Sequence, residues 1–209
     1  THINAEGRKW VHTQLALSIV SPNMKTVLIG PGSVVHLDNL VAEVLGSIDI
    51  IRAKRIRICI HPHAAMVMDY HRTKEQLTMV GIGSTQKGGG AAIAEKLARQ
   101  PDARIRAKDF MRDITRAAEM AGDLPIEVVS GVEYESLLHN AKNVICEGAQ
   151  GYSLGINSGF YPYVTSRECT PAQMASDCLI ALPDIKQVVA VMRTFPIRVA
   201  HRYNAAGDK

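Results

Sequence analysis

The sequence has 209 residues, of which 46% are hydrophobic and 21% are charged. This balance is typical of a folded globular protein and excludes general disorder. The 24 Lys and Arg residues exceed the 20 Asp and Glu residues by a net charge of +4, so we expect small anionic partners and no nucleic acid, whose binders carry a denser basic surface. The longest apolar runs have five residues, far short of the about 20 of a membrane span, and we expect no secretory leader and no membrane partner.

Short apolar stretches alternate with helical ones along the chain. Strands are predicted at 25–30 and 56–60, and a helix between them at 37–48, where apolar residues recur at helical spacing. Further helices are predicted at 91–99, 108–121, 134–140 and 171–180, and further strands at 126–129, 143–146, 187–192 and 197–199. The alternation predicts an α/β fold in which residues 1–209 form a single domain around a mostly parallel central sheet flanked by helices.

The four cysteines, Cys59, Cys146, Cys169 and Cys178, form no C-x-x-C pair. Cys59 and Cys146 lie in apolar, strand-like runs, where buried free thiols are common. We therefore expect no disulfide framework and a reducing, cytoplasmic location.

The most glycine-rich segment, residues 81–90, directly precedes the helix predicted at 91–99. Glycines let a backbone approach a phosphate closely, and the N–H groups at the start of the following helix would then point at the anion. Ser84, Thr85 and Lys87 add hydrogen-bond donors. The segment is therefore a candidate phosphate site.

This segment matches neither of two common phosphate-binding motifs. Gly89 stands where a Walker A loop requires Lys, and Gln86 stands at the third glycine of the dinucleotide fingerprint. From these residues alone, a phosphate site and a flexible surface loop both stay open.

Two later segments are also of ligand-binding type. Gln150 is flanked by glycines just after the strand predicted at 143–146, which is where open α/β sheets place ligands. The alternative is a turn in which the Gln150 amide satisfies the backbone. Residues 161–167 end in Thr165, Ser166 and Arg167, which suits an anion. The alternative for 161–167 is a packed aromatic pair followed by a helix N-cap at Thr170.

Four residues could be read as a metal cluster. They are His61, His63, Asp69 and His71. Two His two positions apart on a strand face the same side, but no third ligand stands at a convincing spacing. We predict no metal site here, and a solvated or substrate-proximal loop instead.

Together and in order, the three segments resemble the adenylosuccinate synthetase family. Residues 83–92 resemble its G-[TS]-T-G-[RK]-G-x-G-P-A segment, 148–151 its G-A-Q-G and 161–166 its Y-P-Y-V-T-S, while 25–35 resemble an earlier strand and glycine turn. Gln86, Gly89 and Ala91 depart from the family pattern, so we expect the glycine-rich loop to differ in shape from that of the family.

Two further stretches resemble the short archaeal and bacteriophage branch of that family. They are 167–170, which replace the usual S-N-T-T, and 193–199, a compact variant of the strand that follows. The phage members of this branch include 2-aminoadenylosuccinate synthetase, which acts on a guanine deoxynucleotide. An enzyme specific for IMP is the alternative.

The resemblance implies a ligase that joins L-aspartate to carbon 6 of a purine nucleoside monophosphate. A nucleoside triphosphate, ATP or GTP, first phosphorylates O6, and aspartate then displaces the phosphate, with Mg²⁺ as cofactor. Thr85 and Thr165 resemble the hydroxyls that hold the 5′-phosphate, and Ser84, Lys87 and Arg198 are further substrate-binding candidates.

The remaining implied roles concern orientation, assembly and acid catalysis. Gln150 resembles the amide that orients the purine near its reacting edge, and Arg99 the arginine that reaches the nucleotide of a neighbouring subunit, which implies a homodimer.

The family's G-D-E-G-K-G-K loop does not occur in these residues, and Thr1 looks like the residue beside the family's catalytic His. We therefore expect the main catalytic Asp and His to lie outside this chain, with His2 as a stand-in acid. The part that recognises aspartate and the donor base is expected beyond Lys209, and a truncated non-catalytic relative stays open.

Overall fold

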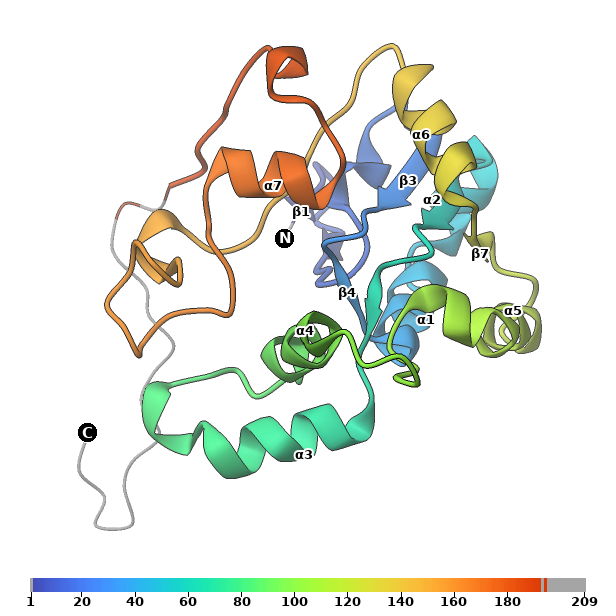
Figure 1. Ribbon diagram of the computed structural model, residues 1–209. Coiled ribbons are helices and arrows are strands. Elements are labelled where there is room, and N and C mark those ends of the chain that lie inside the picture. Colours follow the sequence, from blue (N-terminus) through green and yellow to red (C-terminus); the bar gives the residue numbers. More distant parts are fainter. Residues whose placement is uncertain (1, 193, 195–209) are drawn as a thin grey trace.

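The computed structural model describes residues 2–192 and residue 194 (Figure 1). Its centre is a three-stranded sheet formed by β3 (Thr26–Ile29), β5 (Arg57–Ile60) and β7 (Ile126–Val128), in the order β3-β5-β7. All pairings are parallel, with Val27 opposite Ile58 and Ile58 opposite Ile126. Parallel sheets are covered on both faces, which explains why these strands read as short apolar runs. The predicted α/β class and parallel sheet are confirmed.

One set of helices packs around the main core. It comprises α1 (Leu37–Leu45), α2 (Ile48–Lys54), the 3-10 turn η3 (Ala107–Phe110) and α5 (Met111–Met120). Leu40, Val44, Ile51 and Ile114 from these helices are at most 1% exposed and join the sheet residues in a single core cluster. The helix predicted at 37–48 is two helices, because α1 ends at its C-cap Gly46 and a new helix begins after Ser47.

A second set of elements carries the glycine-rich segment. β4 (Val34–Val35) pairs in parallel with β6 (Ala65–Met66), followed by α3 (Asp69–Thr78), the turn η2 (Val80–Ile82) and α4 (Gly89–Ala98). Figure 1 shows α3 and α4 running side by side. The helix predicted at 91–99 is confirmed as α4, whereas α3 was not predicted.

The remaining elements lie at the two ends of the described chain. β1 (His2–Ile3) pairs antiparallel with β2 (Lys9–Trp10), and the turn η1 (Leu17–Val20) follows. After β7 come α6 (Gly131–His139), η4 (Tyr152–Leu154), α7 (Pro171–Asp177) and η5 (Leu182–Asp184). Among the helices of the described chain, none is long and apolar enough to cross a membrane.

Two predicted strands are wrong. Residues 143–146 and 187–192 are in neither strand nor helix, and Ile145 and Val191 are 70% and 95% exposed. A strand needs a hydrogen-bonded neighbour, and within the described residues no strand pairs with either run. Consequently Cys146, expected to be buried, is exposed, whereas Cys59 is fully buried as predicted. The strand predicted at 197–199 lies outside the described residues.

Candidate functional site

The loop that follows β3 is held against the C-terminal end of α7. The Gly32 N–H donates to the Asp177 carbonyl at 2.9 Å. A Cβ at Gly30 would lie 2.4 Å from that carbonyl oxygen, and one at Gly32 would lie 2.2 Å from the Asp177 carboxylate. Only glycine allows so close an approach, so the two glycines around Pro31 place α7 at the carboxyl end of the central sheet.

The Asp177 carboxylate also fixes the segment before α7. Arg167 Nη1 donates to Asp177 Oδ2 at 2.9 Å, and Gln173 Nε2 donates to Oδ1 at 2.9 Å. Thr170 caps α7, its hydroxyl accepting from the Gln173 N–H at 3.2 Å. The alternative interpretation of Thr170 as an N-cap is therefore correct, and Arg167, read as suited to an anion, is engaged by a carboxylate of its own chain.

Exposed and buried residues alternate along the glycine-rich segment from Thr85 to Gly88. Thr85 and Lys87 are exposed, whereas Gln86 and Gly88 between and after them are buried. Gln86 and Gly88 both have left-handed backbone angles, with φ of 53° and 84°, and the Ser84 hydroxyl accepts from the Gln86 N–H at 3.1 Å. The loop is therefore a defined turn whose outward side carries a hydroxyl and an ammonium group.

The start of α4 is occupied by a carboxylate from α3. Glu75 accepts hydrogen bonds from the N–H groups of Gly88, at 2.8 Å, and Ala91, at 3.1 Å. The expectation that the first N–H groups of this helix face a bound anion is wrong for these two groups. A phosphate at this loop would have to be held by the side chains before the helix.

Two of the predicted segments meet at Gly90. A Cβ there would lie 3.3 Å from the Ser166 Cβ and 3.2 Å from Glu75 Oε1. The neighbouring Thr165 is half-buried, and its N–H donates to the Leu154 carbonyl at 2.8 Å. The structure thus brings the glycine-rich segment and residues 161–167 together, although they lie far apart in the sequence.

The segment around Gln150, residues 147–151, contacts α7. A Cβ at Gly148 would overlap the side chain of Met174 in α7, and the Glu147 carboxylate accepts from the N–H groups of Leu17 and Ser18 at 3.0 and 2.8 Å. Gln150, which follows, is exposed and has a φ of 65°. Residues 147–151 therefore form a turn anchored at Glu147 and Gly148, with the Gln150 side chain available to a ligand.

Lys96 joins two loops at the carboxyl ends of the strands, a role that was not predicted from the sequence. Its Nζ donates to the carbonyls of Pro31, after β3, and His63, after β5, both at 2.6 Å. Burial lowers the pKa of Lys96 from its ordinary value. The two loops are therefore tied to α4, and through it to the glycine-rich segment.

Three other predicted residues lie apart from this cluster or outside the described chain. His2 lies in β1 opposite Trp10, with their ring centroids 5.7 Å apart. Arg99 is the exposed C-cap of α4, in left-handed conformation with a φ of 52°. Arg198 lies outside the described residues.

The histidines considered as metal ligands serve other contacts. His71 is 1% exposed; its Nδ1 accepts from the Met68 N–H at 2.9 Å, so its Nε2 carries the proton that faces Glu95 Oε2 at 2.9 Å. His61 and His63 lie edge to face, with ring centroids 5.3 Å apart. Within residues 2–192 and 194, no group of three or more His, Cys, Asp or Glu could hold a metal ion.

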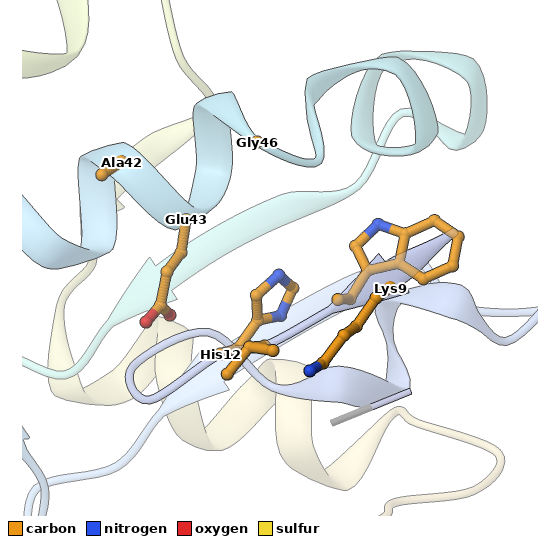
Figure 2. A pocket seen from close by; sticks show the side chains of 7 residues that line it. Lys9, His12, Ala42, Glu43 and Gly46 are labelled. Carbon is orange, nitrogen blue, oxygen red and sulfur yellow. The ribbon is translucent and has the colours of Figure 1, made fainter. Parts of the chain in front are cut away.

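A separate pocket of about 290 Å³ lies between β2 and α1 (Figure 2). Figure 2 shows Glu43 extending from α1 on one side and His12 and Lys9 on the other. The Glu43 carboxylate is already used, since it accepts from the N–H groups of Thr13, Gln14 and Leu15 at 2.7 to 2.9 Å. None of the predicted site residues lines this pocket. The residues that line it are Lys9, Trp10, Val11, His12, Ala42, Glu43 and Gly46.

The fold is that of an α/β protein, and α4 and α7 contact the loops that follow β3 and β5 at the carboxyl ends of its parallel strands. Its sequence matches the family model described as adenylosuccinate synthetase over residues 1–124 and 105–203. The chain therefore belongs to the adenylosuccinate synthetase family.

Three relatives are similar to nearly all of this chain. The N6-succino-2-amino-2'-deoxyadenylate synthase of Acinetobacter phage SH-Ab 15497 is 48% identical over 99% of this chain and 57% of its own length. The protein of the same name from Salmonella phage PMBT28 is 47% identical over 100% of this chain and 57% of its own length. A solved structure of the cyanophage S-2L succinoaminodeoxyadenylate synthetase, bound to dGMP and to dATP as an energy donor, is 34% identical, with a TM-score of 0.83 over 96% of this chain and 54% of that one. This chain thus spans a little over half the length of these relatives.

Proposed function

We propose that this chain is part of a ligase that joins L-aspartate to carbon 6 of a guanine deoxynucleoside monophosphate, dGMP, giving 2-aminoadenylosuccinate in its deoxy form. The observation that carries the proposal is the 48% identity, over 99% of this chain, to a phage protein named for this product. The structure bound to dGMP and dATP supports the same substrate class. The fold supports it as well, because the glycine-rich segment and residues 161–167, which carry the candidate hydroxyls, meet at Gly90.

The reaction needs a good leaving group at carbon 6 of the purine. The triphosphate transfers its γ-phosphoryl group to O6, and the aspartate amino nitrogen then forms the new C–N bond as the C6–O6 bond breaks and inorganic phosphate leaves. We assign Thr85 and Thr165 to the 5′-phosphate of the monophosphate, with Ser84 and Lys87 beside them. Hydroxyls and an ammonium group suit a phosphate because each donates a hydrogen bond to a charged oxygen.

Gln150 is proposed to orient the purine near its reacting edge. Its support is its exposure on a turn held in place by Glu147 and Gly148. An amide both donates and accepts, so it can read a purine edge without carrying charge. His2, in β1 beside Trp10, is the weaker candidate for acid catalysis.

The triphosphate donor is proposed to be ATP or GTP, accompanied by Mg²⁺. Mg²⁺ in nucleotide sites is held largely by phosphate oxygens and water, and the described residues supply no cluster for it. No step is therefore assigned to the ion through this chain's residues.

We further propose a homodimer in which Arg99 reaches the monophosphate of the neighbouring subunit. The support is that Arg99 ends α4 with its side chain exposed, and a guanidinium offers a planar fork to phosphate.

Residues 1–209 are proposed to be one domain, since one large core cluster joins residues from Leu15 to Ile126. The phage relatives favour the cytoplasm of an infected host as its location.

The test is product formation by the complete protein of which this chain is a part, with L-aspartate, Mg²⁺ and ATP, dATP or GTP, supplied in parallel with dGMP, GMP or IMP. The expected result is a succinylated nucleotide from dGMP, identified by a mass equal to dGMP plus aspartate minus water. Product from IMP alone would contradict the dGMP assignment, and no succinylated product from any monophosphate would contradict the ligase.

A further inference from the structure

Glu75 is a buried charged residue in the middle of α3. It is 4% exposed, although the residues beside it in the helix face solvent. Within residues 2–192 and 194, the ion pairs do not include it. A buried carboxylate needs compensation for its lost hydration, so its position requires an explanation from its hydrogen bonds.

That compensation comes from the start of α4. Glu75 Oε2 accepts from the Gly88 N–H at 2.8 Å, and Oε1 from the Ala91 N–H at 3.1 Å. The positive end of the helix dipole adds a favourable interaction with the negative charge. One carboxylate therefore fixes both the last residue of the glycine-rich turn and the first turn of the helix.

The position of Glu75 also connects the two phosphate-binding candidates. Gly90 lies between Glu75 Oε1 and Ser166, since a Cβ there would be 3.2 Å from the first and 3.3 Å from the Ser166 Cβ. Gly88 itself packs on α3, since a Cβ at Gly88 would lie 3.0 Å from the backbone nitrogen of Arg72. A shift of this carboxylate would therefore move the loop that carries Thr85 and the surface against which Ser166 rests.

Glu95 provides a contrast within the same pair of helices. It also connects α3 to α4, through His71 Nε2 and the Tyr70 hydroxyl, each at 2.9 Å. These contacts lie within the helices and involve no residue of the glycine-rich segment. Loss of Glu95 should therefore loosen the packing of α3 on α4 and leave the loop in place.

We infer that Glu75 is a positioning residue for the monophosphate site. Its carboxylate holds the glycine-rich turn in the shape that presents Thr85 and Lys87, and it occupies helix N–H groups that would otherwise attract the anion. The phosphate is then bound by side chains before α4 rather than by the start of the helix. This inference rests on the proposed function, because it names what positions the same site.

The test compares Glu75→Gln with Glu95→Gln in the otherwise unchanged protein. Glutamine keeps one acceptor but turns an N–H₂ group toward the second backbone N–H. We expect Glu75→Gln to raise the Kd for dGMP about tenfold in calorimetry, and Glu95→Gln to change it less than about twofold. In hydrogen exchange, the peptide over 83–92 should exchange faster in Glu75→Gln than in the wild type, with or without nucleotide.

A third variant separates position from charge. Glu75→Asp keeps both oxygens on a side chain one methylene shorter, so its Kd should lie between those of the wild type and Glu75→Gln, and it serves as the test if the glutamine variant fails to fold. Equal Kd values for the Glu75 variants and wild type, or equal weakening by Glu95→Gln, would overturn the inference. Wild-type protein that binds no purine monophosphate would overturn the proposed function instead, while faster exchange over 83–92 would still support the hold of Glu75 on the loop.

Discussion

Asp177 and Gly32 form a contact that joins α7 to the loop after β3. The Gly32 N–H donates to the Asp177 carbonyl at 2.9 Å, and the Asp177 carboxylate fills the space that a side chain at Gly32 would need. The same carboxylate binds Arg167 and Gln173. The loop after β3, the helix and the segment before it are therefore held as one unit at the candidate site.

Gly32→Ala should separate this unit. The new Cβ would lie 2.2 Å from Asp177 Oδ1, so α7 must shift, at a cost of about 1–3 kcal/mol in the free energy of unfolding. Urea denaturation would measure it. The matched control is Gly151→Ala, where nothing lies within 4 Å of the Cβ and φ is −129°, and where a change within about 0.5 kcal/mol is expected. Equal stabilities of the two variants would contradict the contact.

Thr85→Ala should weaken monophosphate binding. Thr85 is exposed on the outward side of the glycine-rich turn, so its removal should cost a hydrogen bond to a charged oxygen, about 1.5–3 kcal/mol, or roughly tenfold to a hundredfold in Kd. Calorimetry with dGMP measures this. Thr78→Ala is the control, because the Thr78 hydroxyl donates to the Lys74 carbonyl of its own helix at 2.8 Å. An unchanged Kd in Thr85→Ala would refute the assignment of this site.

The central sheet could be predicted because its strands are short runs rich in β-branched residues, and the middle strand β5 is buried from Ile58 to Ile60. α3 could not, because the buried positions of this helix are the polar residues His71 and Glu75, which give no apolar period. Residues 143–146 show the opposite error, since an apolar run becomes a strand only beside a hydrogen-bonding neighbour.

The candidate site also has features that could be predicted from the sequence and others that could not. Residue type and order identified Thr85 and Gln150 as ligand-binding candidates, because hydroxyls and amides among glycines can be read from the local sequence. The contacts of Asp177 with Gly32 and of Glu75 with Gly88 join residues 145 and 13 positions apart. Such pairings depend on how the elements pack, which local spacing does not specify.

Cys146 should be the thiol that reacts first. Its Sγ lies 3.5 Å from that of Cys178, whose hydrogen bond lowers the pKa of Cys146 to about 7, whereas burial raises the pKa of Cys59 to about 11. Since the thiolate is the nucleophile, iodoacetamide at about pH 7.5 should label Cys146 well before Cys59. Peptide mapping by mass spectrometry measures the two rates. Cys178→Ala should slow the labelling of Cys146, and similar rates at Cys146 and Cys59 would contradict the prediction.

Glu43 should make the stability of the protein depend on pH in the acidic range. Burial alone would raise the pKa of this carboxyl, but the hydrogen bonds from the N–H groups of Leu15, Gln14 and Thr13 outweigh it and lower the pKa below its ordinary value. The carboxylate is thus favoured by folding, so its contribution is fully present above the unfolded pKa of about 4.3 and is lost as the pH falls through the folded value.

Glu43→Gln isolates this contribution, because glutamine offers one acceptor and does not titrate. At neutral pH the variant should be less stable than the wild type by about 1–3 kcal/mol. As the pH falls from about 6 to about 3, the wild type should lose stability faster, and the difference between the two proteins should shrink. Thermal unfolding of both proteins across this range measures it, and a difference that stays constant with pH would show that the loop N–H groups at residues 13–15 do not depend on the Glu43 charge.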